Sequence, residues 1–289
     1  MTGLPYDLVD VFADRPYGGN PLAVVHGGAA LTDAAMQAIA REFHLSETVF
    51  TLPPTTSDAD YRVRVFTPTT ELPYAGHPSI GAAWVLARTG VIQHGDVRQQ
   101  CGAGIVPVHV DDAGARIAGG RPETGESLDA AALAEAVGLT AEDVVGEERH
   151  GTAAAGAFFA FLQVHDDAVA RARPDAAAVV ARTAGTVGLV LFSFDPASSR
   201  AHVRMFAPGA GVMEDPGGGA SAVALGVHLV HRSLLPPDGV SSFAISQGAE
   251  LGRPSAMEVE VHARDGRVVE TTVRGTVVAV ARGELLRLP

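Results

Sequence analysis

The sequence VRVFTP at residues 63–68 returns as VRMFAP at residues 203–208, about half of the 289-residue chain later. Each copy runs through a short loop to a glycine-containing turn, AGHPS at 75–79 and DPGGG at 215–219. Each turn leads into an apolar, small-residue run that predicts a helix, at 80–88 and at 221–231. The shared order of strand, loop, turn and helix favours duplication over chance.

The rest of the chain mixes strands with fewer helices. Strand patterns occur at 6–12, 22–25, 48–52, 105–110, 158–164, 187–192, 259–262, 268–273 and 277–281. Helix patterns occur at 32–43, 127–137 and 174–184. We therefore expect an α+β protein with two pseudo-symmetric lobes, each a curled sheet around a central helix. The expected lobes are 1–118 with 278–289, and 119–277, and the polar stretch 119–127 is expected to carry the crossing between them.

Two such lobes would set two helix N-termini on either side of a cleft. A helix N-terminus presents unpaired backbone N–H groups and a partial positive charge, which suits a small carboxylate. The glycines in both turns would let a substrate approach the backbone closely.

Composition excludes several functions. All 21 basic residues are arginine, so Schiff-base chemistry on lysine, including that of pyridoxal phosphate, and a Walker phosphate loop are excluded. The net charge of −12 and the scattered arginines argue against nucleic acid and anionic membranes as partners. The single cysteine, Cys101, forbids a disulfide within the chain, and no apolar stretch reaches membrane-spanning length. With no signal-peptide pattern at residues 1–15, we expect a cytoplasmic protein.

Three polar residues lie at turns or at a strand end. Glu47 begins an apolar strand pattern, so it is either a partly desolvated acid/base with a raised pKa or a strand-edge carboxylate facing water. His77, in the first turn, either contacts substrate or caps the following helix. Asp215, in the second turn, is open to the same two interpretations. His228 and His231 lack the further ligands of a metal site, so no metal is expected.

The motifs as a set resemble the PhzF-like family. The matching stretches run in order over 10–255: DVFADRP (10–16), GNP (19–21), LSET (45–48), FTP (66–68), GHP (76–78), EDP (214–216), QG (247–248) and GRPS (252–255). The resemblance implies a fold of diaminopimelate-epimerase type, commonly a homodimer, with the active site between the lobes. It also implies a cofactor-independent isomerase that shifts double bonds in a small unsaturated carboxylic or amino acid, in antibiotic or other secondary-metabolite biosynthesis.

The resemblance also assigns roles to residues. Glu47 would carry the proton from one carbon to another, and His77 and Asp215 would orient the substrate and assist the transfer. The remaining residues assigned to substrate binding are Asn20, Ser46, Gly76, Gly218, Gly219 and Ser221. Epimerases of the same fold use two cysteines, but here Gly76 and Asp215 fall at or beside those positions, so two-thiol racemisation is excluded.

The second turn departs from the family pattern EDPxTGS. Gly218 stands at the threonine position and Ala220 at the serine position, with Ser221 one residue later. The departure suggests either another substrate or a shifted helix start. Two alternatives stay open: a non-catalytic PhzF-like binding protein, and an epimerase that uses Glu47 and His77 as opposing bases.

Overall fold

The structure is a computed structural model that describes residues 3–146 and 148–289. The chain divides into two compact units: unit 1 is Met1–Ile117 with Arg274–Pro289, and unit 2 is Ala118–Val273. These bounds differ from the expected lobes at residue 118, which falls in unit 2, and at residues 274–277, which fall in unit 1. Among the described helices none is both long enough and apolar enough to cross a membrane.

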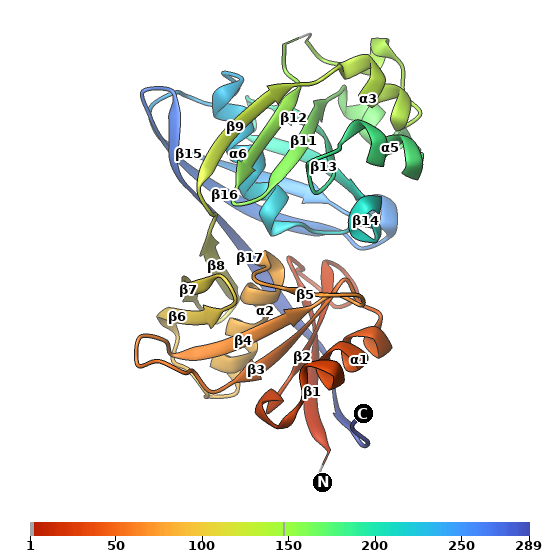
Figure 1. The fold of residues 1–289 in the computed structure, drawn as a ribbon. Helices are drawn as coiled ribbons and strands as arrows, with labels where there is room; N and C mark the ends of the chain where they lie inside the picture. Colours follow the sequence, from red (N-terminus) through yellow and green to blue (C-terminus); the bar gives the residue numbers. More distant parts are fainter. Residues whose placement is uncertain (1–2, 147) are drawn as a thin grey trace. The chain divides into compact units, whose positions relative to one another are not determined.

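Unit 1 is a curled sheet with one helix inside it and one outside (Figure 1). In chain order its elements are β1 (Leu4–Val11), β2 (Asn20–Val25), α1 (Asp33–Phe43), β3 (Glu47–Leu52), β4 (Tyr61–Phe66), β5 (Glu71–Leu72), α2 (Gly76–Arg88), β6 (Gly95–Cys101), β7 (Gly104–Val110) and β8 (Gly114–Ala118). The inner helix α2 packs on β1, β2, β3, β4 and β7, which lie around it. The outer helix α1 covers β3 and β4, and its Met36 and Ile39 pack in one buried cluster with Phe50 of β3.

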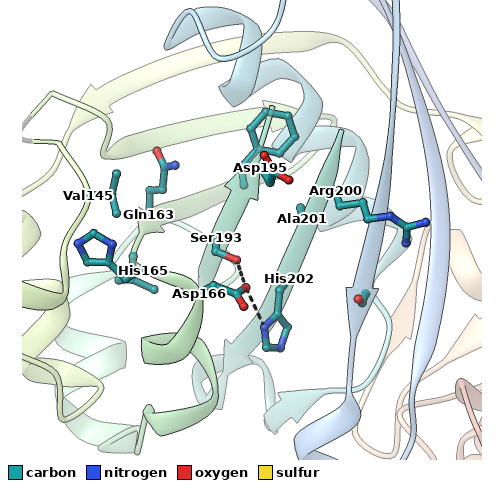
Figure 2. Close-up of a pocket in the computed structure, with 12 residues that line it drawn as sticks. Val145, Gln163, His165, Asp166, Ser193, Asp195, Arg200, Ala201 and His202 are labelled. Carbon is teal, nitrogen blue, oxygen red and sulfur yellow. Dashed lines mark hydrogen bonds and ion pairs between the residues drawn. The ribbon is translucent and has the colours of Figure 1, made fainter. Parts of the chain in front are cut away.

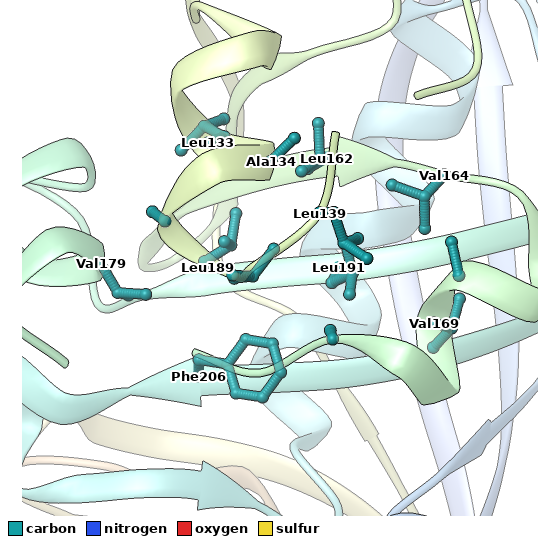
Figure 3. Close-up of a cluster of buried hydrophobic side chains, with 14 of the residues drawn as sticks. Leu133, Ala134, Leu139, Leu162, Val164, Val169, Val179, Leu189, Leu191 and Phe206 are labelled. Carbon is teal, nitrogen blue, oxygen red and sulfur yellow. The ribbon is translucent and has the colours of Figure 1, made fainter. Parts of the chain in front are cut away.

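Unit 2 repeats this plan with more helix on the outside. Its elements are β9 (Pro122–Ser127), α3 (Ala130–Ala136), β10 (Gly151–Ala155), β11 (Phe158–Gln163), α4 (Asp166–Arg171), α5 (Ala176–Arg182), β12 (Leu189–Asp195), β13 (Arg200–Ala207), β14 (Val212–Asp215), α6 (Gly219–His231), β15 (Gly239–Gln247) and β16 (Ser255–Arg264). The inner helix α6 packs on β9, β10, β11 and β16. Figure 3 shows the outer core, where Leu133, Val179 and Val169 from the short helices meet Leu189 and Phe206 of the sheet.

The same strand pairings occur in both units. In unit 1, β2 pairs parallel with β3, β3 antiparallel with β4, and β4 parallel with β6. In unit 2, β11, β12, β13 and β15 pair in the same senses and order. The fold is therefore α+β with two pseudo-symmetric lobes, each a curled sheet around a central helix, as the repeat predicted.

The repeat also fixes one side-chain arrangement in both units. Arg64 on β4 donates two hydrogen bonds to Glu71, at 2.7 and 2.6 Å, and its guanidinium lies 5.1 Å from the ring centre of Phe66. Arg204 on β13 donates two hydrogen bonds to Glu214, both at 2.8 Å, and lies 5.0 Å from the ring centre of Phe206. Each bidentate pair joins the long strand to the short strand before the inner helix, so it sets the path of the chain into that helix.

The sequence misplaced several elements. Residues 122–127, expected within the crossing, form β9, which pairs with β10 inside unit 2. Residues 267–285 form one strand, β17 (Arg267–Leu285), rather than the expected pair 268–273 and 277–281. The inner helices begin at Gly76 and Gly219, earlier than the apolar pattern suggests. Small residues carry little hydrophobic signal, so these first turns are invisible to periodicity.

Candidate active site

Glu47 lies at the edge of the unit 1 sheet where two parallel strands begin. It is the first residue of β3 and pairs with Leu22, and Asn20 is the first residue of the neighbouring β2. Parallel strands bring their N-terminal ends to the same sheet edge, so residues 27 positions apart in the chain become neighbours. Ser46, which precedes Glu47, donates a hydrogen bond of 3.1 Å to Asn20 Oδ1.

His77 reaches the same place from the inner helix. It lies in the first turn of α2, and its Nε2 is 3.5 Å from Glu47 Oε2. The His77 side chain is 6% exposed and that of Glu47 is 18% exposed. Glu47 Oε2 is itself buried and forms no hydrogen bond among the described residues. One carboxylate oxygen thus faces an imidazole inside the protein, while part of the side chain stays accessible to a small molecule.

Asn20 fixes the protonation pattern of this histidine. Asn20 is 1% exposed, and its Nδ2, an N–H donor, lies 3.4 Å from His77 Nδ1. A ring nitrogen that accepts a hydrogen bond carries no proton, so in the neutral imidazole the proton is on Nε2. The nitrogen that carries this proton is the one 3.5 Å from Glu47 Oε2. The contacts from Ser46 through Asn20 to His77 therefore favour a protonated ring nitrogen on the side of the carboxylate.

Burial raises the pKa of Glu47 to about 7, although the neighbouring Ser46 side chain lowers it. A buried carboxylate loses hydration that its charged form needs, so the protonated form persists to higher pH. Near neutrality both forms of Glu47 are populated. A group in this range can accept a proton in one step and return it in the next.

The second turn is built around Asp215 in unit 2. Asp215 ends β14, and its Oδ1 accepts a hydrogen bond of 3.1 Å from the Gly217 N–H. Its backbone carbonyl accepts a hydrogen bond of 2.7 Å from Gln247 Nε2. Gly218 is the N-cap of α6 and Gly219 its first residue. Neither Gly218 nor Ala75, the N-cap of α2, has a side chain that could cap its helix, so first-turn N–H groups are left to other acceptors.

Gly218 and Ser221 depend on each other. The Ser221 hydroxyl is almost fully buried and donates a hydrogen bond of 2.9 Å to the Gly218 carbonyl. A Cβ on residue 218 would lie 2.5 Å from Ser221 Oγ and 3.0 Å from Asp215 Oδ2. Gly218, which stands at the threonine position of the family pattern, therefore leaves room for the side chain of Ser221. In this turn the serine hydroxyl serves the helix start.

The sequence-predicted residues thus fall into two groups. Unit 1 brings together Glu47, His77, Asn20 and Ser46, with Gly76 at the start of α2. Unit 2 holds Asp215, Gly218, Gly219 and Ser221 in one turn. Among the described residues, no group of three or more His, Cys, Asp or Glu side chains is arranged to hold a metal ion.

Sequence patterns missed two polar clusters. One lies behind the first turn of α2 and joins Tyr61, Gln99 and Ser79. The other lies in unit 2, in a cavity of about 540 Å³ that none of the predicted residues lines (Figure 2). There Ser193 donates a hydrogen bond of 2.6 Å to Asp166, which lies 3.5 Å from His202. The alternation of β6 could have revealed Gln99, since a polar residue at an inward position of a strand needs a partner.

Known proteins place the chain in a family. The family described as "Phenazine biosynthesis-like protein" matches residues 9–283. An "uncharacterized isomerase" of Mesorhizobium japonicum is 35% identical over 97% of this chain and 98% of its own length. The trans-2,3-dihydro-3-hydroxyanthranilate isomerase of Pseudomonas fluorescens is 31% identical over 97% of this chain and 99% of its own length.

Solved structures agree on the fold. A PhzF-family phenazine biosynthesis protein of Bacillus anthracis has a TM-score of 0.88 at 22% identity, covering 99% of this chain and 100% of its own. A hydroxyproline epimerase of Agrobacterium vitis has a TM-score of 0.65 at 15% identity, covering 98% and 92%. The fold is thus shared between PhzF proteins and epimerases. The chain belongs to the phenazine biosynthesis-like (PhzC-PhzF) family and is an isomerase.

Proposed function

We propose that this isomerase shifts double bonds in a small unsaturated carboxylic or amino acid, with Glu47 as the proton carrier. The observation that supports this best is the state of Glu47: burial brings its pKa to about 7 while its Oε2 faces His77 Nε2 at 3.5 Å. One such group can remove a proton from one carbon and return it to another on the same face of the substrate. No cofactor enters the proposed reaction.

The other residues follow from this role. His77, held with its proton on Nε2, donates toward the charge that develops as the C–H bond breaks. The uncapped first turn of α2, with Gly76, is proposed to offer backbone N–H groups to a carboxylate, and the uncapped first turn of α6, with Gly218 and Gly219, is proposed to offer the same in unit 2. Asp215 is proposed to orient the substrate.

Asymmetry between the repeats supports a single carrier. Thr48 pairs with Phe66 in unit 1 and Leu189 pairs with Phe206 in unit 2, so these strand positions correspond. The counterpart of Glu47 is therefore Gly188, where a Cβ would lie 2.2 Å from the Phe206 carbonyl oxygen. Unit 2 cannot supply a second acid/base at the matching position.

The epimerase alternative fits the geometry less well. Two opposing bases must be separated by the carbon between them, but Glu47 Oε2 and His77 Nε2 are 3.5 Å apart. A Glu47 side chain in bulk solvent would favour the non-catalytic alternative, whereas its Oε2 is buried.

The substrate class draws support from the relative named for trans-2,3-dihydro-3-hydroxyanthranilate, and a role in secondary metabolism from the family's description. A homodimer in the cytoplasm completes the proposal, and sedimentation of the purified chain would measure its assembly.

The test is turnover in D₂O of trans-2,3-dihydro-3-hydroxyanthranilate and a panel of unsaturated amino acids by wild type and Glu47→Gln. We expect deuterium at the carbon that gains a proton, and a loss in kcat of about 10² to 10⁴-fold in the variant. Full turnover by Glu47→Gln would refute the role of the carboxylate.

A further inference from the structure

A one-directional hydrogen-bond chain lies buried behind the first turn of α2. The Tyr61 hydroxyl donates to Gln99 Oε1 at 3.2 Å, and Gln99 Nε2 donates to Ser79 Oγ at 2.8 Å. Ser79 Oγ in turn donates to the carbonyl of Ala75 at 2.8 Å. Gln99 and Ser79 are 0% exposed and Tyr61 is 2% exposed. Every donor points the same way, from the sheet toward the helix start, and aligned hydrogen bonds in a dry interior strengthen one another.

This hydrogen-bond chain anchors the first turn of α2 through the Ala75 carbonyl, and it leaves the first-turn N–H groups uncapped. The N-cap Ala75 has no polar side chain, and Pro78 within the first turn has no N–H. Ser79 instead holds the Ala75 carbonyl through both its hydroxyl and its backbone N–H, the latter at 3.3 Å. Burial raises the pKa of Tyr61 well above its ordinary value, so the phenol keeps the proton that it donates.

The hydrogen-bond chain from Tyr61 to Ala75 also connects the sheet and the helix that form the unit 1 site. Tyr61 and Gln99 pair directly in register across β4 and β6, and β4 is the antiparallel neighbour of β3, which carries Glu47. Ser79 belongs to the helical turn that carries His77. The hydrogen bonds therefore join the sheet that bears the carboxylate to the helix that bears the imidazole.

We infer that Gln99 is a positioning residue: by joining Tyr61 to Ser79 it sets the first turn of α2 and hence the placement of His77 against Glu47. The inference rests on the proposed role of those two residues. Gln99 acts through His77 and does not itself contact the substrate. Small displacements matter, since a shift of about 1 Å in a reacting group can cost about 10²-fold in rate.

The principal variant is Gln99→Leu, and its matched control is Gln100→Leu. Gln100 is the next residue of β6, and its amide forms two hydrogen bonds with Thr55, at 2.8 and 2.6 Å, away from α2. We expect Gln99→Leu to lower kcat by roughly tenfold to a hundredfold with KM little changed. Gln100→Leu should keep both constants within about twofold, because it leaves the helix start untouched.

A second readout needs no substrate. Long-range ¹H–¹⁵N spectra report the tautomer and environment of each histidine ring, with His77 assigned by comparison with His77→Asn. The His77 signals should move in Gln99→Leu and stay in place in Gln100→Leu. Tyr61→Phe removes only the first hydrogen bond and should give a smaller change in the same direction, which also covers the case in which Gln99→Leu does not fold.

Gln99→Glu tests the direction of the chain. A protonated carboxyl can accept from Tyr61 and donate to Ser79, whereas its ionised form cannot donate. The ratio of its kcat to that of wild type should therefore fall as pH rises.

Folded Gln99→Leu with wild-type kcat and unmoved His77 signals would overturn the inference. Activity retained by Glu47→Gln would instead remove the proposed function, and the His77 spectra would still decide whether Gln99 positions the ring.

Discussion

Replacing Glu47 by glutamine should make the protein more stable at neutral pH. In the folded chain burial raises the pKa of Glu47 from 4.5 to about 7. The unfolded carboxyl ionises near its ordinary value, so between these limits the folded state binds more protons than the unfolded state. Stability present below pH 4.5 is therefore lost as pH rises toward 7. Glutamine has no such ionisation, so the variant escapes this loss.

The size of the effect follows from the shift. Each pKa unit corresponds to about 1.4 kcal/mol. The difference in free energy of unfolding between variant and wild type therefore grows by about 3 kcal/mol from pH 4.5 to 7. Between pH 5.5 and 7 the expected growth is about 2 kcal/mol. Above about pH 8, where the folded carboxyl is almost fully ionised, the difference should be constant. The side chain is only 18% exposed, so solvent screening takes little from this value.

Urea unfolding at half-unit steps from pH 5.5 to 8.5 measures the free energy of unfolding of both proteins. Glu42→Gln, an exposed glutamate of α1, is the control and should track wild type at every pH. A difference between Glu47→Gln and wild type that stays flat across this range would refute the claim that burial holds the Glu47 proton. The same ionisation predicts that kcat/KM rises with pH through about 7, since the base must first lose its proton.

Three further changes test the packing around the site. Gly218→Ala should destabilise the protein by about 1–3 kcal/mol, and adding Ser221→Ala should recover much of this in a double-mutant cycle, since the new Cβ meets the Ser221 hydroxyl at 2.5 Å. Arg204→Met should cost about 3–5 kcal/mol, and Arg64→Met clearly less, in thermal unfolding, because the glutamate partner of Arg204 is 9% exposed and that of Arg64 is 41% exposed. Asn20→Leu should cost about 1–3 kcal/mol and change the His77 ring signals in ¹⁵N spectra, since it removes the donor to Nδ1; unchanged signals would contradict the tautomer assignment.

The sequence by itself determined the repeat and the positions of the chemically capable residues. Strand periodicity and glycine turns are short-range signals, so the copies at 63–68 and 203–208 already predicted two similar lobes. The motifs marked Glu47, His77, Asn20 and Ser46, which the structure gathers in unit 1.

Only the tertiary structure decided how these residues act. Tyr61 and Gln99 are 38 residues apart, and their hydrogen bond exists because the register of β4 against β6 sets them side by side. The raised pKa of Glu47 likewise depends on what covers it. Register and burial arise from contacts between distant segments, and no local pattern of residues encodes them.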